Sequence, residues 1–472
     1  MGRGHAIRPV LALNSLADLA AAELLESYRT GRLSPVEVVR AVIARIEARE
    51  PKLHALYLFR PEAALAAAAV SEARWARGEA RALEGVPLTL KENVATVGDP
   101  MPLGTAAREP PLSLRDAPAA ARLAEAGSVL LAKTVMPDFG MLSSGLSSFH
   151  PLARNPWDLS KTPGGSSSGA GAAAAAGYGP LHVGTDIGGS IRLPGTWCGI
   201  VALKPSFGRV PVDPPYWGRV AGPMTRTVRD AALMMREMAG PDARDGMSLP
   251  LAALDFAGPG IGLKGLRIGY LPQAGCGLPV DPEVAAAVEH AARLFEREGA
   301  VVETIAPFLT REMLDGLDRF WRARSCADLD ALGPDAWRRV LPYIAEWVEP
   351  ARRYDGATVY HGVSQIHAIR DATLRATGVF DFVLSPVAPC TAFPAGMASP
   401  LDDPQRPFEH ICFTMPFNFS EQPAISVPAA TSRAGLPIGL QVVGRRFDDP
   451  GVLALAAAFE RLRDPLPPWP AL

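Results

Sequence analysis

The stretch TPGGSSSGAGAAAAAG, Thr162–Gly177, places three consecutive serines between glycines and then runs into an alanine-rich segment. Residues with so little side-chain bulk predict a helix that packs closely against a sheet. A plain flexible linker has no reason to lead directly into such a helix. A second cluster of glycine and serine, GTDIGGSIRLP, follows at Gly184–Pro194. The two segments therefore predict structured loops that act together.

Two short patterns fit the first segment, but both lack the structural context that they need. Residues 169–174 match a dinucleotide-binding fingerprint, yet a loop precedes them where the fingerprint requires a strand. Gly165–Gly169 matches the nucleophile elbow of α/β-hydrolases, with Ser167 at its centre. The elbow requires a strand that runs straight into the serine, and Pro163 and Gly164 disfavour one. The sequence therefore favours neither cofactor binding nor an elbow.

Outside these loops, short apolar runs alternate with helical segments. Strands are predicted within 86–90, 128–135, 180–186, 198–205, 266–272, 301–307, 381–386, 424–430 and 436–444. Helices are predicted within 34–50, 116–127, 225–240, 281–298 and 450–463. This alternation predicts an α/β/α fold, in which helices cover both faces of a twisted, mixed and mostly parallel sheet.

The same pattern predicts one large domain over residues 1–472, with no internal repeat. The first ten residues are expected to form a loose arm. The parts of the domain are expected to be N-terminal helices in 15–80, the core with the serine loops in 81–245, a helical insertion in 308–370 and the C-terminal part of the sheet in 380–465.

The composition excludes several classes of protein. The chain is 48% hydrophobic and 20% charged, as in ordinary globular proteins. A formal charge of −2 gives no reason to expect nucleic acid or an anionic membrane as a partner. No signal-peptide core and no apolar run of about 18 residues is present. Five scattered cysteines without a CxxC pair disfavour a metal site and predict reduced thiols in the cytoplasm.

Lys91 ends the apolar run GVPLTLK, in a chain with six lysines against 41 arginines. An ammonium group at this position would face a buried sheet edge, and burial lowers the pKa of a lysine. A lysine with a lowered pKa can act as a base, whereas arginine cannot because it stays protonated. The alternative is a salt-bridged strand end. Taken alone, Lys91 leaves both interpretations open.

Lys91 and the two serine segments belong to three longer motifs, GVPLTLKEN, NPWDLSKTPGGSSSGAGAAAAAG and GTDIGGSIRLPGTWCGIVALKPSFGRVP. With TMPFNFSEQPAISVPAA and GLPIGLQVVGRRFDD further along, they resemble the amidase signature family of serine hydrolases over roughly residues 15–465. The resemblance implies a catalytic triad of Lys91, Ser166 and Ser190, and a cis peptide bond before Ser166. Ser168 stands where many members have glycine, and the loop is compatible with both residues.

The resemblance also implies what each group does, without a cofactor. Ser190 attacks a carbonyl carbon and forms an acyl-enzyme, while Ser166 relays the proton to neutral Lys91. An oxyanion hole is expected from the backbone at Ile187, Gly188, Gly189 and Ser190. Support for the loops is expected from Ser167, Asp186 and Arg192. A purely structural ion pair explains Asp186 and Arg192 equally well.

The substrate is expected to be a small amide or carbamate. The protein is expected to be a monomer or a homodimer. Within the family, the chain looks like the metagenome-derived urethanases, which cleave carbamates, anilides and activated esters. The strip around Gly140 and Met141 matches the position of the family's acyl pocket. One alternative is the glutaminase subunit of a tRNA-dependent amidotransferase, although the sequence shows no obvious cationic cluster for a glutamine carboxylate. The other is a binding protein on an inactive scaffold, which the intact triad disfavours.

The segment 308–370 interrupts the alternation of strands and helices with clustered aromatic residues. They are Phe320, Trp321, Trp337, Tyr343, Trp347, Tyr354 and Tyr360. One interpretation is a helical cap that packs on itself. The other is that some of these rings form the wall of an apolar substrate cavity.

Overall fold

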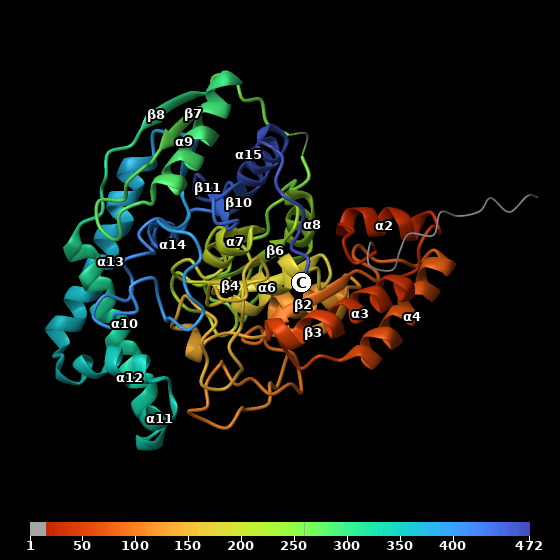
Figure 1. Ribbon diagram of the computed structural model, residues 1–472, viewed down its shortest axis with the longest axis horizontal. Helices are drawn as coiled ribbons and strands as arrows, with labels where there is room; N and C mark the ends of the chain where they lie inside the picture. Colours follow the sequence, from red (N-terminus) through yellow and green to blue (C-terminus); the bar gives the residue numbers. More distant parts are fainter. Residues whose placement is uncertain (1–15, 259) are drawn as a thin grey trace, which may run out of the picture.

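The computed structural model describes residues 16–258 and 260–472, so the arm expected over the first ten residues lies outside the described part. Its centre is an 11-stranded sheet in the order β1-β3-β2-β4-β6-β5-β10-β11-β9-β7-β8 (Figure 1). The strands are β1 (Leu56–Tyr57), β2 (Pro87–Lys91), β3 (Val129–Thr134), β4 (Leu181–Asp186), β5 (Val201–Lys204), β6 (Val220–Thr225), β7 (Arg267–Tyr270), β8 (Val301–Thr304), β9 (Phe382–Pro386), β10 (Ala424–Thr431) and β11 (Pro437–Gly444).

The sheet is mixed, but the prediction that it is mostly parallel is wrong. Four neighbouring pairs run parallel: β2 with β3, β2 with β4, β7 with β8, and β7 with β9. The other six pairs are antiparallel. Apolar runs of buried strands look alike in both directions, so the sequence pattern could not distinguish the two arrangements.

Two features place antiparallel neighbours in the middle of the sheet. Strand β6 is absent from the predicted strands, because Gly222 and Pro223 interrupt its apolar pattern, and it pairs antiparallel with both β4 and β5. Strands β10 and β11 form a hairpin across residues 432–436, where the sequence pattern suggested a continued alternation of strands and helices.

Helices cover both faces of the sheet, as predicted. In β5, Val201 and Leu203 pack in the same core as residues of α8, α9 and α15, whereas Ala202 packs with residues of α6 and α7. The helices are α2 (Ala21–Arg29), α3 (Pro35–Leu53), α4 (Pro61–Arg77), α5 (Pro118–Glu125), η1 (Asp138–Gly140), α6 (Ser168–Ala176), α7 (Arg192–Cys198), α8 (Val228–Met238), α9 (Pro282–Arg297), α10 (Arg311–Ala331), α11 (Pro334–Arg339), α12 (Pro342–Val348), η2 (Glu349–Arg353), α13 (Gly356–Thr377), α14 (Pro416–Phe419) and α15 (Asp449–Leu462). Among the described residues, no helix is long and apolar enough to cross a membrane.

The alanine-rich segment forms α6, and every residue of this helix is buried. Its glycines allow the close contact that the sequence predicts. A Cβ at Gly169 would lie 2.2 Å from the Ala55 carbonyl oxygen, and a Cβ at Gly171 would lie 2.8 Å from Pro194 Cβ. Helix α6 can therefore approach its neighbours only because these positions lack a side chain.

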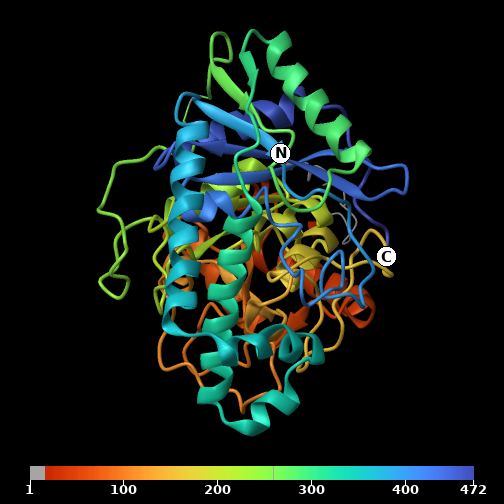
Figure 2. The same ribbon diagram turned by 90° about the vertical axis from the view of Figure 1, so that its left-hand side faces the viewer.

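The segment 308–370 is helical, as expected, and holds α10, α11, α12, η2 and most of α13. The two long helices α10 and α13 lie side by side (Figure 2). They meet at Gly316 and Gly362, where a Cβ on Gly362 would lie 2.7 Å from the Gly316 carbonyl oxygen. As a result, Trp321 of α10 lies against the loop that follows β4.

Candidate active site

Lys91 is the last residue of β2, and its side chain is fully buried. Its Nζ lies 2.8 Å from Ser166 Oγ and 3.1 Å from both Ser167 Oγ and Thr185 Oγ1. Burial lowers the pKa of Lys91 to about 7, although nearby carboxylates oppose the shift. Since no described carboxylate forms an ion pair with it, the structure does not support the interpretation as a salt-bridged strand end.

Ser166 lies in the loop that leads into α6, and the Gly165–Ser166 peptide bond is cis. The side chain of Ser166 is buried, with Gly140 directly against it. A Cβ at Gly140 would lie 3.2 Å from Ser166 Oγ. Gly140 also has a φ of +72°, which side chains rarely tolerate. Gly140 therefore leaves room for the Ser166 hydroxyl.

Ser167 connects Lys91 to the second serine loop. Its Oγ accepts hydrogen bonds from Lys91 Nζ and from the Thr185 N–H at 3.2 Å, and it donates to the Thr185 carbonyl oxygen at 3.1 Å. The N–H of Ser167 donates to the Ser190 carbonyl oxygen at 3.1 Å. Because a hydroxyl has one donor and two acceptor sites, the Ser167 hydroxyl is fully occupied. This arrangement suits a positioning residue and not the nucleophile of an elbow.

Ser190 lies in the loop between β4 and α7, where it lines a pocket with Ile187 and Gly188. Within the described part of the chain, the N–H groups of Ile187, Gly188 and Ser190 have no acceptor, so they are free to bind a substrate oxygen. Gly189 differs from the expected set, because its N–H donates to Asp186 Oδ1 at 2.8 Å. Its φ of +134° shapes the turn, and a Cβ there would lie 2.5 Å from Thr414 Oγ1.

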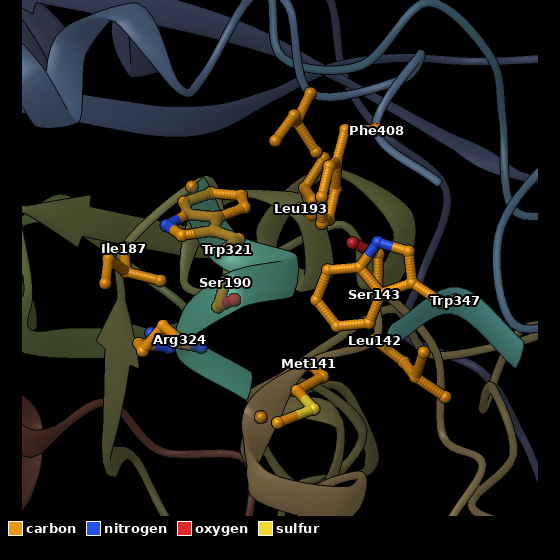
Figure 3. A pocket seen from close by; sticks show the side chains of 13 residues that line it. Met141, Leu142, Ser143, Ile187, Ser190, Leu193, Trp321, Arg324, Trp347 and Phe408 are labelled. Atoms are coloured by element: carbon orange, nitrogen blue, oxygen red, sulfur yellow. The ribbon is translucent and has the colours of Figure 1, made fainter. Parts of the chain in front are cut away.

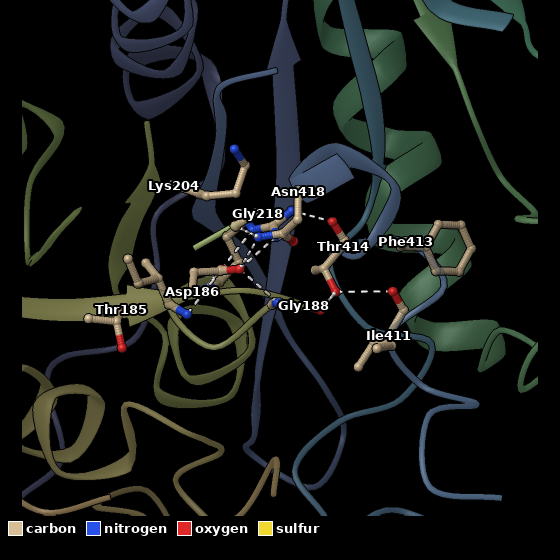
Figure 4. A network of polar contacts seen from close by, with 12 residues as sticks. Thr185, Asp186, Gly188, Lys204, Gly218, Ile411, Phe413, Thr414 and Asn418 are labelled. Carbon is tan, nitrogen blue, oxygen red and sulfur yellow. Dashed lines mark hydrogen bonds and ion pairs between the residues drawn. The ribbon is translucent and has the colours of Figure 1, made fainter. Parts of the chain in front are cut away.

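Asp186 and Arg192 form a fully buried ion pair across the base of this loop. Nε and Nη2 of Arg192 each lie 3.0 Å from the Asp186 carboxylate. Burial alone would raise the pKa of Asp186, but the charge and hydrogen bonds of Arg192 hold it at about 2. The carboxylate also accepts from the Asn418 side chain at 2.8 Å (Figure 4). Because Asp186 ends β4 and Arg192 begins α7, the ion pair fixes both ends of the loop that contains Ser190.

The segment that holds α14 completes this network from the other half of the chain. Arg192 donates to the Thr414 carbonyl oxygen, the Gln441 side chain and the Asn418 side chain. Thr414 Oγ1 donates to the Gly188 carbonyl oxygen at 2.6 Å (Figure 4). The bond from Thr414 and the bond from the Gly189 N–H to Asp186 together fix the Gly188–Gly189 peptide group, which lies between the free N–H groups of Gly188 and Ser190.

The pocket beside Ser190 is partly open to solvent and has mainly apolar walls (Figure 3). Its other lining residues are Gly140, Met141, Leu142, Ser143, Ile187, Gly188, Leu193, Trp321, Arg324, Trp347, Phe408 and Ile411. Both residues expected at the acyl pocket, Gly140 and Met141, are among them. Phe408 joins two of the walls, because its ring meets Trp321 at 4.8 Å and Trp347 at 5.5 Å, both edge to face.

The two interpretations of the aromatic segment each hold for some of its residues. Trp321 and Trp347 line the pocket, whereas the other five rings of the segment are not among its lining residues. Tyr343 instead donates to the Asp403 carbonyl oxygen, and Trp337 packs under the Arg352 guanidinium at 4.2 Å. The segment therefore packs partly on itself and partly on the stretch near Asp403, and two of its rings line the pocket with Ser190.

Sequence reasoning missed several residues of this site. Thr185 holds Lys91 and is itself held by Asn93 at 3.1 Å, and a hydroxyl at the end of a strand in a serine–glycine motif is a signal for such a role. Phe408, Ile411 and Arg324 carry no such signal. They lie far from the serine motifs in the chain, and only the tertiary fold brings them to the pocket.

These groups have the components that acyl transfer to a serine requires. A lysine with a pKa near neutrality contacts a chain of hydroxyls, and free N–H groups lie beside a serine that lines an apolar pocket. Within the described residues, no group of three His, Cys, Asp or Glu side chains could hold a metal ion.

Comparisons with known proteins agree with this geometry. Among curated proteins, the glutamyl-tRNA(Gln) amidotransferase subunits A of Geobacter metallireducens and Myxococcus xanthus are similar to the chain. The first is 36% identical over 94% of this chain and 97% of its own. The second is 37% identical over 95% of this chain and 98% of its own.

Solved structures of amidases have the same fold. A bacterial aryl acylamidase matches with a TM-score of 0.86 and 31% identity, over 94% of this chain and 96% of its own. The peptide amidase of Stenotrophomonas maltophilia matches with a TM-score of 0.81 and 26% identity, over 96% and 99% of the two chains. The family model described as Amidase matches residues 37–453. The chain therefore belongs to the amidase signature family, whose members act as hydrolases on C–N bonds.

Proposed function

We propose that the chain hydrolyses amides and carbamates that carry apolar or aryl groups, and also activated esters, through an acyl-enzyme or carbamoyl-enzyme on Ser190. The observation that carries this proposal is the 2.8 Å contact between buried Lys91 Nζ and Ser166 Oγ, beside a pocket that Ser190 lines. A neutral amine in contact with a relay hydroxyl is the base that a serine nucleophile needs.

The proposed reaction has two halves. Ser190 Oγ attacks the carbonyl carbon, its proton passes to Ser166 Oγ, and the Ser166 proton passes to Lys91 Nζ. The C–N bond then breaks, and the same chain returns a proton to the leaving nitrogen. A water molecule attacks the acyl-enzyme, gives up a proton by the same route, and releases the acid and the free Ser190 hydroxyl.

The loop that follows β4 is proposed to stabilise the negative charge that develops on the carbonyl oxygen. The unoccupied N–H groups of Ile187, Gly188 and Ser190 are the proposed donors. Removing one such donor from an oxyanion hole typically costs about 100-fold to 1,000-fold in turnover. The hydrogen bonds from Thr414 to the Gly188 carbonyl oxygen and from the Gly189 N–H to Asp186 fix the peptide group between the proposed donors of Gly188 and Ser190, which pre-organises the loop.

The preference for apolar and aryl substrates rests on the pocket walls. Trp321, Trp347 and Phe408 present ring surface, and Met141 adds an adaptable thioether on the opposite side. The likeness to an aryl acylamidase, at 31% identity and a TM-score of 0.86, supports the same substrate class.

The alternative function is that of a glutaminase subunit in a tRNA-dependent amidotransferase. The 36% identity to glutamyl-tRNA(Gln) amidotransferase subunits A favours it. The two functions differ in what the chain does alone. A free hydrolase cleaves aryl amides and carbamates as the purified chain, whereas glutaminase activity that requires an added partner protein would support the amidotransferase.

The proposal is tested by Ser190→Ala and by covalent labelling. Loss of a catalytic nucleophile typically reduces turnover by about 10³-fold to 10⁶-fold, so hydrolysis of an aryl amide should disappear while the circular dichroism spectrum is kept. A fluorophosphonate should label Ser190, identified by peptide mass spectrometry. Ser143→Ala is the matched control, because this serine also lines the pocket. Labelling of Ser167 or Ser143 in place of Ser190 would refute the assignment.

A further inference from the structure

Two arginines from distant parts of the chain converge on one tyrosine ring next to the proposed active site. The guanidinium of Arg219 lies 5.1 Å from the centre of the Tyr216 ring, and that of Arg324 lies 5.2 Å from it. Arg219 comes directly before β6, and Arg324 lies on α10. Two like charges so close together repel one another, so an arrangement of this kind costs free energy unless an anion joins it.

The side-chain polar groups of this cluster form no hydrogen bond within the described chain, and their one ion pair is long and exposed. Neither guanidinium donates a hydrogen bond to a described residue, and the nearest acid, Asp328, lies 3.9 Å from Arg324 Nε and is 58% exposed. Arg324 Nε and Tyr216 Oη are buried and have no hydrogen-bond partner among the described residues. Burial, and then the charge of Arg324, lower the pKa of Arg219 below its usual range. Buried polar atoms are normally paired, so Arg324 Nε and Tyr216 Oη are placed to bind a polar group of a ligand.

Arg324 lines the pocket that Ser190 lines, whereas Arg219 lines a neighbouring pocket together with Asn93 and Thr185. Figure 3 shows Arg324 beside Ile187 and Ser190, on the side of the pocket opposite Trp347 and Phe408. Arg219 lies close by, because it shares its pocket with Thr185, whose hydroxyl contacts Lys91, and because a Cβ placed on its neighbour Gly218 would lie 3.8 Å from Ile187 Cγ1. An anion bound here would therefore be part of a substrate whose carbonyl group lies at Ser190.

We infer that Arg219, Arg324 and Tyr216 form a subsite for a carboxylate group of the substrate. The inference rests on the proposed function and narrows its substrate class to amides or carbamates with an apolar body and a carboxylate at one end. The planar fork of a guanidinium matches a carboxylate with two parallel hydrogen bonds, and the Tyr216 hydroxyl adds a third donor. Arg324 lies on the side of Ser190 opposite Trp347 and Phe408 (Figure 3), so one substrate can contact both the apolar wall and the arginine.

The test compares substrates that differ only in the charged group. For a carboxylate on the acyl side, glutaryl para-nitroanilide is compared with pentanoyl para-nitroanilide, which shares its leaving group. For a carboxylate on the leaving side, para-acetamidophenylacetate is compared with para-ethylacetanilide. In one of the two pairs, kcat/KM of the anionic substrate should exceed that of the neutral one by roughly tenfold or more, and the excess should shrink as salt is added.

Variants assign that preference to the two arginines. Arg324→Gln and Arg219→Gln should each lower the ratio of anionic to neutral kcat/KM by roughly tenfold or more, and Arg324→Lys should retain part of it. Arg353→Gln, which removes the same charge from an exposed position of the helical segment, should leave the ratio unchanged. A ratio of one or less in both pairs, or a preference that survives in both glutamine variants, would overturn the inference.

A binding measurement separates this inference from the proposed function. Phenylacetate is titrated into the Ser190→Ala variant, which cannot turn over, with phenylacetamide as the neutral control. Calorimetry should show that the carboxylate binds at least about tenfold more tightly and that Arg324→Gln removes the difference. Equal binding of the two compounds would refute the carboxylate subsite even if Ser190 were not the nucleophile. If the wild-type chain hydrolyses neither of the two neutral substrates, the proposed function is refuted, but the carboxylate subsite is not.

Discussion

At the scale of single residues, a low pKa does not by itself mark a base. Burial lowers the pKa of Lys204 to about 7, as it does for Lys91. Lys204 Nζ, however, donates to the carbonyl oxygen of Pro205 at 3.0 Å, a group that has no proton to give. Lys91 contacts three hydroxyls, and one of them, Ser166, lies beside the pocket strip at Gly140. The difference between the two lysines lies in the groups that can exchange a proton with them.

The first prediction concerns the ionisation of Lys91. Its folded pKa is lowered from 10.5 to about 7, so the neutral, active form is present above about pH 7 and is lost as the pH falls through that value. The kcat/KM for an aryl amide should therefore rise along a limb centred near pH 7 and stay high towards pH 10. Lys91→Arg should be nearly as inactive as Lys91→Ala, because arginine stays protonated throughout.

The control for this prediction is Lys204→Met, which removes a second buried lysine whose pKa is lowered to about 7. This variant should keep the activity limb near pH 7 if it folds, as judged by its circular dichroism spectrum. The base assignment fails if Lys91→Arg keeps substantial activity, or if the activity limb near pH 7 moves in Lys204→Met.

The sequence revealed residues whose roles depend on their immediate neighbours. Lys91, Ser166 and Ser190 stand in compact motifs, and the structure places the first two in contact and the third on the adjoining loop. Arg219 and Arg324 could not be found in this way, because they meet only after β6 and α10 have packed near the same pocket. The absence of an obvious cationic cluster in the sequence therefore reflected the separation of its members along the chain.

At the scale of elements, the ends of β4, α7 and α14 are joined by one buried ion pair. Both side chains of Asp186 and Arg192 have 0% exposure, and Arg192 also donates to groups near α14 and on β11. Burying two charges costs free energy that their attraction only partly offsets. The pair therefore fixes the geometry of the loop more than it stabilises the fold, whereas removal of one partner leaves the other charge uncompensated.

The second prediction follows from that asymmetry. Asp186→Asn should lower the free energy of unfolding by roughly 3–5 kcal/mol, because Arg192 would stay buried without a counter-charge. Urea denaturation followed by circular dichroism measures the change. Asp335→Asn is the matched control, because its ion pair with Arg338 is exposed and should contribute little. A similar small change in both variants would show that Arg192 finds solvent or another partner.

The pH dependence of stability tests the same ion pair. The folded pKa of Asp186 is lowered from 3.8 to about 2, so its contribution is complete above about pH 3.8 and is lost as the pH falls towards 2. The difference in unfolding free energy between the wild type and Asp186→Asn should shrink across that window. A difference that is constant from pH 5 to pH 2 would contradict the role of the charge.

The sequence predicted most elements but not the direction in which the strands run. Apolar runs located β2 to β5 and β7 to β11, and the predicted helices within 34–50 and 225–240 contain most of α3 and all of α8. Strand β6 escaped because its glycine and proline weaken the strand signal. Its antiparallel insertion between β4 and β5 is a tertiary feature, and it reverses the local order that an alternation of strands and helices suggests.

At the scale of the whole molecule, the pocket is assembled from segments that are distant in the chain. Gly140 and Met141 come from the end of η1, Trp321 and Trp347 from the helical segment, and Phe408 from the stretch before α14. Aromatic side chains predicted at least one wall of a cavity, but which rings face Ser190 depends on how α10 lies against α13. Neither composition nor periodicity contains that information.

The third prediction is that this assembled wall sets the preference for aryl groups. Phenylacetyl para-nitroanilide should have a higher kcat/KM than butanoyl para-nitroanilide. Because both substrates release para-nitroaniline, leaving-group ability does not contribute to the difference. At roughly 25 cal/mol per Å² of apolar area, burial of about 60 Å² more ring surface gives a tenfold advantage. Phe408→Leu should lower that ratio, because the ring that contacts both Trp321 and Trp347 is lost.

The control for the aryl preference is Tyr360→Leu, which changes a ring that belongs to the same helical segment but is 74% exposed. This variant should keep both kcat/KM values, whereas a general loosening of the segment would change them together. If the wall acts on the ground state and the transition state alike, the loss in Phe408→Leu should occur mainly in KM. Equal efficiency towards the two anilides in the wild type would show that the rings around Ser190 do not contact the acyl group, and would strengthen the case for a glutaminase subunit.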